Sequence, residues 1–168
     1  MTKQILITKL FISSPGPNQF SRSRLLDRLL SWSDWKLTIN FAPATYGKTT
    51  LLSEWISQGD ILFAWHSLDQ HNNDLKRFLV LITANLQFIQ LEIDEQILNL
   101  YQSPFNPFTT DLPPLKNLTS NEKHRFVLIL DEYHLIRIKV IHQTLRYLLD
   151  NLLYRMRLAI ATPTDMLL

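Results

Sequence analysis

The feature that most constrains this chain is a short loop between an apolar strand candidate and a helix candidate. The strand candidate covers residues 37–42 (LTINFA), and it runs directly into APATYGKTT. The stretch from Ala42 to Thr49 is close to the phosphate-loop pattern G-x-x-x-x-G-K-[ST] (Walker A), with alanine at the first glycine position. Backbone N–H groups at the start of a helix form a nest for phosphate oxygens. The context therefore predicts a strand, a phosphate-binding loop and a helix, in that order.

The residue types in this loop suit a nucleotide with a bound cation. Gly47 lets the backbone pass close to the phosphate, Lys48 reaches the β and γ oxygens, and the hydroxyl of Thr49 ligates Mg²⁺. We therefore expect ATP or ADP with Mg²⁺ as the ligand. The expected binding residues are Pro43, Ala44, Thr45, Tyr46, Gly47, Lys48, Thr49 and Thr50.

A second apolar segment ends in two acidic residues. Residues 126–132 (FVLILDE) match the Walker B pattern, in which a buried strand carries a carboxylate at its tip. Asp131 would hold Mg²⁺ together with Thr49, and Glu132 would polarise the attacking water as the general base. The alternative is that both acids only begin a surface loop. The pairing with a Walker A pattern favours the nucleotide site.

Strand and helix candidates alternate along the chain. Apolar residues at helical spacing predict helices near 21–32, 49–57, 75–89 and 138–152, and apolar runs predict strands at 37–42, 61–68, 126–130 and 158–161. This alternation predicts an α/β fold of the P-loop NTPase type, with a parallel sheet covered by helices on both faces. Residues 1–20 are expected to form an extended arm. The proline-interrupted stretch 94–122 is expected to be irregular.

Composition excludes several other classes of protein. The chain has 168 residues, no cysteine and only 3 glycines, so it can hold neither a disulfide framework nor a repeated-glycine dinucleotide motif. A net charge of +2 is too small to indicate nucleic-acid binding by itself. Because no apolar run approaches the roughly 18 residues of a membrane span, we expect a cytoplasmic protein without a membrane segment.

Five histidines raise the question of a metal site. They stand at positions 66, 71, 124, 134 and 142, and no pair has a convincing ligand spacing. We therefore expect surface or packing roles for them.

Four segments in order resemble the N-terminal ATPase module of the MalT-like transcription regulators, which are LuxR-family activators of the STAND class of P-loop NTPases. These segments are ITKLFISSPGPNQFSRSRLLDRL (7–29), FAPATYGKTTLLSEW (41–55), FAWHSLDQHNNDLKRFL (63–79) and FVLILDEYHLI (126–136). The helix segment IHQTLRYLLDNL (141–152) is also similar. The resemblance thus covers nearly the whole chain.

The resemblance implies a switch that is operated by a nucleotide. In this family ATP and an inducer favour an oligomerising active form, ADP holds the resting form, and hydrolysis is slow. Carried over by position, Lys48 and Thr49 bind phosphate and Mg²⁺, Asp131 supports Mg²⁺, and Glu132 stands where the family often has a second aspartate. Arg22 and Arg24 lie in the segment that usually lines the adenine side.

The sequence also departs from the family pattern. Thr45 stands at a glycine position of the loop, where a positive φ would strain a β-branched residue. Pro163 replaces the arginine that follows the last strand, and proline carries no charge and no N–H. Relatives continue with a further strand and more domains. The resemblance therefore implies that residues 21–168 are a partial domain without its last strand, and that this chain carries no DNA-binding domain.

Three functions remain open at this point. The first is an ATP-binding module of a MalT-like regulator with weak or no hydrolysis, at most a slow ATPase. Its partners would be a nucleotide and either a separately encoded remainder of the regulator or a second copy, without direct contact to DNA or a membrane. The second is a degenerate remnant or protein-interaction fragment that does not bind nucleotide. The third is a complete small P-loop kinase, although an arginine-bearing lid is not evident.

Overall fold

The computed structural model describes residues 22–31, 35–59, 62–88, 126–151 and 156–163. The expected arm (1–20) and the expected irregular stretch (94–122) lie outside these residues. Met156 begins the last described strand, and the description ends at Pro163.

The core of the molecule is a parallel four-stranded sheet. Its strands are β1 (Leu37–Phe41), β2 (Leu62–Ser67), β3 (Phe126–Asp131) and β4 (Met156–Thr162), in the spatial order β1-β4-β3-β2. The central strands β3 and β4 are buried at every position, which explains why their sequences are almost uniformly apolar. The predicted α/β fold with a parallel sheet is confirmed.

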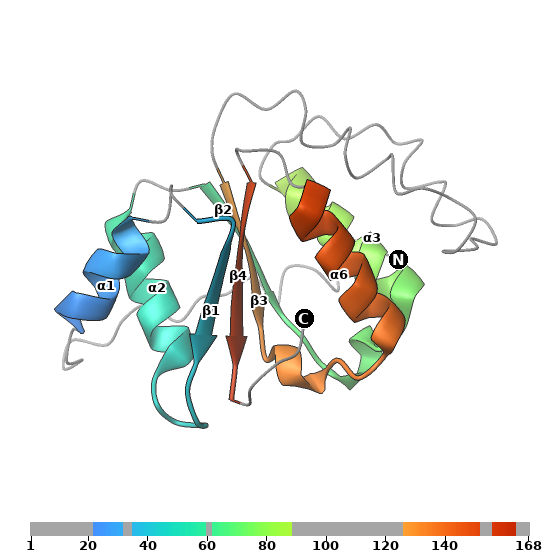
Figure 1. Cartoon of the computed structure of the whole chain (residues 1–168), viewed down its shortest axis with the longest axis horizontal. Helices are drawn as coiled ribbons and strands as arrows, with labels where there is room; N and C mark the ends of the chain where they lie inside the picture. Colours follow the sequence, from blue (N-terminus) through green and yellow to red (C-terminus); the bar gives the residue numbers. More distant parts are fainter. Residues whose placement is uncertain (1–21, 32–34, 60–61, 89–125, 152–155, 164–168) are drawn as a thin grey trace.

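Helices cover both faces of this sheet (Figure 1). The helices α1 (Ser23–Leu30) and α2 (Lys48–Gln58) lie on one face, and α3 (Leu75–Phe88) and α6 (Lys139–Asn151) lie on the other. The alternation of side chains along β3 divides the core accordingly. Val127 and Ile129 pack with α1 and α2, whereas Leu128 belongs to the cluster under α3 and α6. All four predicted helices and all four predicted strands are therefore present, with ends displaced by a few residues.

The strand order decides where polar residues meet. Because all strands are parallel, the segments that follow β1, β3 and β4 leave the sheet at the same edge. Two short 3₁₀ helices complete this edge, η2 (Gln70–Asn72) after β2 and η3 (Tyr133–Leu135) after β3. The loop after β1 thus faces Glu132 and Pro163.

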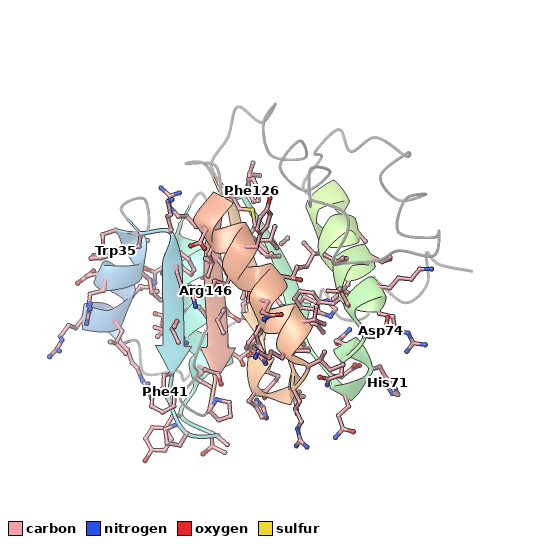
Figure 2. All side chains as sticks on the ribbon, turned by 45° about the vertical axis from the view of Figure 1, so that its right-hand side comes forward. Trp35, Phe41, His71, Asp74, Phe126 and Arg146 are labelled. Carbon is pink, nitrogen blue, oxygen red and sulfur yellow. The ribbon has the colours of Figure 1, made fainter. Side chains whose placement is uncertain are left out.

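The strand β1 lies at one edge of the described sheet, next to β4. Its side chains Ile39 and Phe41 are 46% and 55% exposed, which is unusual for apolar residues of a strand. Phe41 projects at the carboxyl end of β1 in Figure 2. Among the described helices, none is both long and apolar enough to span a membrane.

Candidate functional site

The loop between β1 and α2 turns into the helix at Gly47. This residue has φ +70° and ψ +34°, in the left-handed region, and its carbonyl accepts the first helical hydrogen bond from the N–H of Leu51 at 2.9 Å. A Cβ at this position would meet Thr50 Cβ at 3.7 Å, which is an ordinary contact. The backbone conformation, and not lack of space, is therefore what favours glycine here.

Thr45 adopts the left-handed conformation that favours glycine. Its φ is also +70°, although it is a β-branched residue. For an L-residue with a Cβ this region costs about 1–2 kcal/mol. The loop therefore keeps its shape at this position against the preference of its own side chain.

Lys48 folds back across the loop that precedes it. Its side chain is only 8% exposed, and Nζ donates to the carbonyl oxygens of Ala42 at 2.8 Å and Pro43 at 3.0 Å. The amide of Asn40 in β1 donates to the Lys48 carbonyl at 3.1 Å. An ammonium group has three donors, so one N–H of Lys48 is left by these contacts for another acceptor.

The two motifs meet through one hydrogen bond. The hydroxyl of Thr49 donates to Oδ2 of Asp131 at 2.9 Å, and the N–H of Glu132 donates to the other carboxylate oxygen at 2.9 Å. Asp131 is 3% exposed. Since the hydroxyl proton of Thr49 is committed to the carboxylate, its oxygen lone pairs are available to a hard cation, for which oxygen ligands are preferred. These residues therefore fit Mg²⁺.

A cavity of about 380 Å³ lies over the start of α2. Its loop side is formed by Ala44, Thr45, Gly47, Lys48, Thr49 and Thr50, and its far side by Glu132, His134 and Pro163. Most of the residues expected from the sequence are thus brought together. Pro43, Tyr46 and Asp131 do not line the cavity: Pro43 offers its carbonyl to Lys48, Tyr46 is 57% exposed, and Asp131 is buried beside Thr49.

The far side of the cavity combines an acid, a histidine and a proline. Oε2 of Glu132 lies 3.3 Å from Nδ1 of His134, an ion-pair distance when the imidazole is protonated. Glu132 has φ +56°, so the chain turns sharply as it leaves β3. Pro163 lines this cavity and offers it neither charge nor an N–H.

Sequence reasoning missed His134 as a member of this site. The expectation of surface or packing roles for the histidines rested on ligand spacing, and it did not include the place of His134 at the cavity beside Glu132. The available signal was its position just after the Walker B acids. His142 does have a packing role, because its Nδ1 lies 2.8 Å from the hydroxyl of the buried Tyr133.

Comparison of the sequence with known proteins identifies relatives of this chain. No family model matches the sequence. The HTH-type transcriptional regulators MalT of Yersinia pestis (strain Pestoides F) and Serratia proteamaculans (strain 568) are each 32% identical to the chain, over 143 and 137 residues. Each match covers 80% of this chain and 15% of the regulator, so the chain spans about 15% of the length of these curated relatives.

A solved structure agrees with the fold. The Walker-type ATPase of Pyrococcus abyssi matches 91% of this chain and 48% of its own, with a TM-score of 0.53 and 12% sequence identity. At this identity the likeness concerns the fold alone, which is that of an α/β P-loop NTPase.

Proposed function

Because the chain is homologous to the N-terminal P-loop module of MalT-like transcription regulators, we propose that it binds ATP or ADP with Mg²⁺ and serves as the nucleotide-dependent part of such a regulator. The observation that carries this proposal is the Thr49–Asp131 hydrogen bond at 2.9 Å. It joins the hydroxyl and the carboxylate that a phosphate-bound Mg²⁺ requires.

Each residue of the cavity takes a defined part in this proposal. The N–H groups from Ala44 to Thr50 surround the phosphates at the positive end of the α2 dipole. Lys48 supplies a fixed ammonium group at the mouth of the loop. Thr49 and Asp131 hold Mg²⁺, which neutralises the phosphate oxygens when it is bound. Pro43 and Tyr46 act through the loop backbone, since their side chains do not line the cavity.

Slow or absent hydrolysis follows from the far side of the cavity. Glu132 is placed as general base, but its carboxylate is shared with His134 at 3.3 Å. Pro163 cannot stabilise the charge that develops on a transferred phosphoryl group. The bound nucleotide would then act mainly as a signal, in a cytoplasmic STAND-class protein whose remaining parts, or a second copy, receive it. We assign no direct DNA contact to these residues.

The second candidate function is a remnant that no longer binds nucleotide. The strained Thr45 at φ +70° favours it, because an unfavourable residue persists easily where the loop has lost its ligand. The two candidates differ in one measurable property, which is the dependence of nucleotide affinity on Lys48.

A titration with a fluorescent ATP analogue tests the proposal. It is carried out with and without Mg²⁺ on the wild type, on Lys48→Ala, and on Lys36→Ala, which removes the same charge from an exposed position beside β1. We expect Mg²⁺-dependent binding that Lys48→Ala weakens at least about tenfold and that Lys36→Ala leaves unchanged. Equal affinity of all three proteins, or no binding by the wild type, would support the remnant instead.

A further inference from the structure

One side chain outside the cavity ties the segment after β3 to the region before α3. Nδ2 of Asn73 donates to the carbonyl oxygen of Leu135 at 2.7 Å, and Oδ1 of Asn73 accepts from the N–H of Arg137 at 2.6 Å. These contacts span 62 and 64 positions of the sequence. An amide group carries a donor and an acceptor, and Asn73 uses both ends on the same backbone segment. It thus acts as a clamp on residues 135–137.

Residues 135–137 belong to a longer connecting segment between β3 and α6, which starts at the far side of the cavity. It leaves β3 at Asp131, passes through Glu132 and His134, and reaches the start of α6 at Lys139. Its first turn is held at one end by the hydrogen bond from the N–H of Glu132 to Asp131. The Asn73 clamp holds the other end. The positions of both cavity side chains therefore depend on a residue that does not line the cavity.

Tyr133, which lies between these two side chains, is anchored in the core. It is 1% exposed, and its hydroxyl lies 2.8 Å from Nδ1 of His142 in α6. Burial raises the pKa of the Tyr133 hydroxyl and lowers the pKa of His142, so burial favours the uncharged form of both groups in this contact. With Tyr133 held inward, Glu132 and His134 are left on the cavity side.

The region that presents Asn73 is itself well defined. Oδ1 of Asp69 accepts from the N–H of His71 at 2.9 Å, and Oδ1 of Asn72 accepts from the N–H of Asp69 at 2.7 Å. This reciprocal capping forms η2 directly before Asn73. In Figure 2, His71 and Asp74 lie at the foot of α3, at the end of the molecule to which the carboxyl ends of the strands point. Asn73 therefore follows a capped turn at the site edge of the sheet.

We propose that Asn73 is a positioning residue that sets how the module distinguishes ATP from ADP. The inference rests on the proposed function. The loop N–H groups and Lys48 can hold the phosphates that both nucleotides share, whereas a terminal phosphate meets the far side. There a carboxylate repels it and the imidazole of His134 can donate to it, so a small displacement of the pair changes the ATP affinity more than the ADP affinity.

Three variants separate positioning from general stability. Asn73→Ala removes both ends of the clamp. Asn73→Asp keeps an acceptor for the N–H of Arg137 but loses the donor to Leu135. Asp74→Ala is the control, because it breaks the neighbouring hydrogen bond from the N–H of Arg77 at the start of α3 without touching residues 135–137 or the turn before Asn73.

The experiment measures the dissociation constants of ADP–Mg²⁺ and of the slowly hydrolysed analogue ATPγS–Mg²⁺ for the wild type and these variants, with the thermal midpoint of each. We expect Asn73→Ala to change the ratio of the two constants by about fivefold to tenfold, with ADP affinity within about twofold of wild type. Asn73→Asp should give an intermediate ratio. Asp74→Ala should lower the midpoint, because it removes a helix cap, and should leave the ratio unchanged.

Two results would overturn the inference. One is an unchanged ratio in folded Asn73→Asp or Asn73→Ala protein, and the other is an equal change of ratio in Asp74→Ala. Either would leave the proposed function intact if the wild type binds nucleotide in a Lys48-dependent manner. A wild type that binds neither nucleotide would overturn both proposals together.

Discussion

Thr49 and Asp131 stand 82 positions apart in the sequence, and a 2.9 Å hydrogen bond joins their side chains. The hydroxyl belongs to the first turn of α2 and the carboxylate to the last residue of β3. A bond to a buried carboxylate is stronger than a neutral one, because the charge assists it. This contact is the physical link between the phosphate loop and the acidic strand end.

A double-mutant cycle measures that link. Thr49→Val removes the hydroxyl and nearly keeps the shape, Asp131→Asn removes the charge, and the free energy of unfolding is compared for the single and double variants. We expect a coupling energy of about 1 kcal/mol or more. Strictly additive effects would mean that the hydrogen bond does not contribute to stability. In the same proteins, Thr49→Val should abolish the Mg²⁺ dependence of nucleotide affinity.

Thr45→Gly should stabilise the protein although it removes side-chain atoms. Relief of the left-handed conformation gains about 1–2 kcal/mol, and the greater freedom of glycine in the unfolded chain offsets about 0.5–1 kcal/mol. We therefore expect a net gain of roughly 0.5–1 kcal/mol in urea unfolding. Nucleotide binding should also tighten.

The neighbouring position supplies the control for this prediction. Ala44 is not among the described residues with positive φ, so Ala44→Gly has no strain to relieve and should destabilise the protein. A stabilising effect of Ala44→Gly, or none of Thr45→Gly, would show that the loop tolerates threonine without strain.

Glu132→Gln should lower ATP turnover without weakening ATP binding, because the substitution removes a negative charge from the far side of the cavity. The variant keeps the shape of the side chain but cannot accept a proton from water, and loss of a general base costs about 10²–10⁴ in rate. Single-turnover hydrolysis and nucleotide titration measure the two properties. Glu54→Gln makes the same charge change in α2, outside the residues that line the cavity. If both variants turned over equally, Glu132 would not be the base.

The stability of the protein should fall in mild acid because of His142. The pKa of His142 in the folded state lies below the ordinary value of 6.5, and burial of the ring is the main cause. A hydrogen bond with the backbone of Ile136 raises this pKa and so opposes part of the shift. Between the lowered pKa and 6.5 the unfolded chain therefore binds more protons than the folded one. The contribution of His142 to the free energy of unfolding is complete above about pH 6.5, and it is lost as the pH falls through the pKa of His142 in the folded state.

Urea unfolding of wild type and His142→Gln from pH 7.5 to pH 5 checks this prediction. The wild type should lose more stability over this range than the variant. The exposed His71 provides a control substitution, His71→Gln, which should follow the wild type. A wild-type curve parallel to that of His142→Gln would exclude this histidine as the cause.

Local sequence patterns were sufficient for the secondary structure. The apolar runs that became β3 and β4 are buried on both sides, and the helices have one apolar stripe each, so period and length distinguish them. Gly47 was predictable as a loop residue for the same local reason, because a tight turn before a helix needs a residue that accepts positive φ. The same reasoning predicted that Thr45 would be strained if the loop required a positive φ at that position.

Contacts between distant segments could not be predicted in this way. The clamp by Asn73 has no local signature, because an isolated asparagine has many more common roles. The place of His134 on the cavity has only a weak one, its position just after the Walker B acids. The periodicity of apolar residues also does not predict the spatial order β1-β4-β3-β2. It depends on how the helices cross over the sheet and pack against it.

The helices, the strands, the phosphate loop and the acidic strand end were thus readable from local sequence, because each depends on interactions between near neighbours in the chain. The folded arrangement was needed to show that Thr49 reaches Asp131, that His134 stands beside Glu132, and that Asn73 contacts the segment that follows them. The physical reason is the parallel sheet, which brings the carboxyl ends of distant strands to one edge, where short polar side chains come within hydrogen-bonding distance.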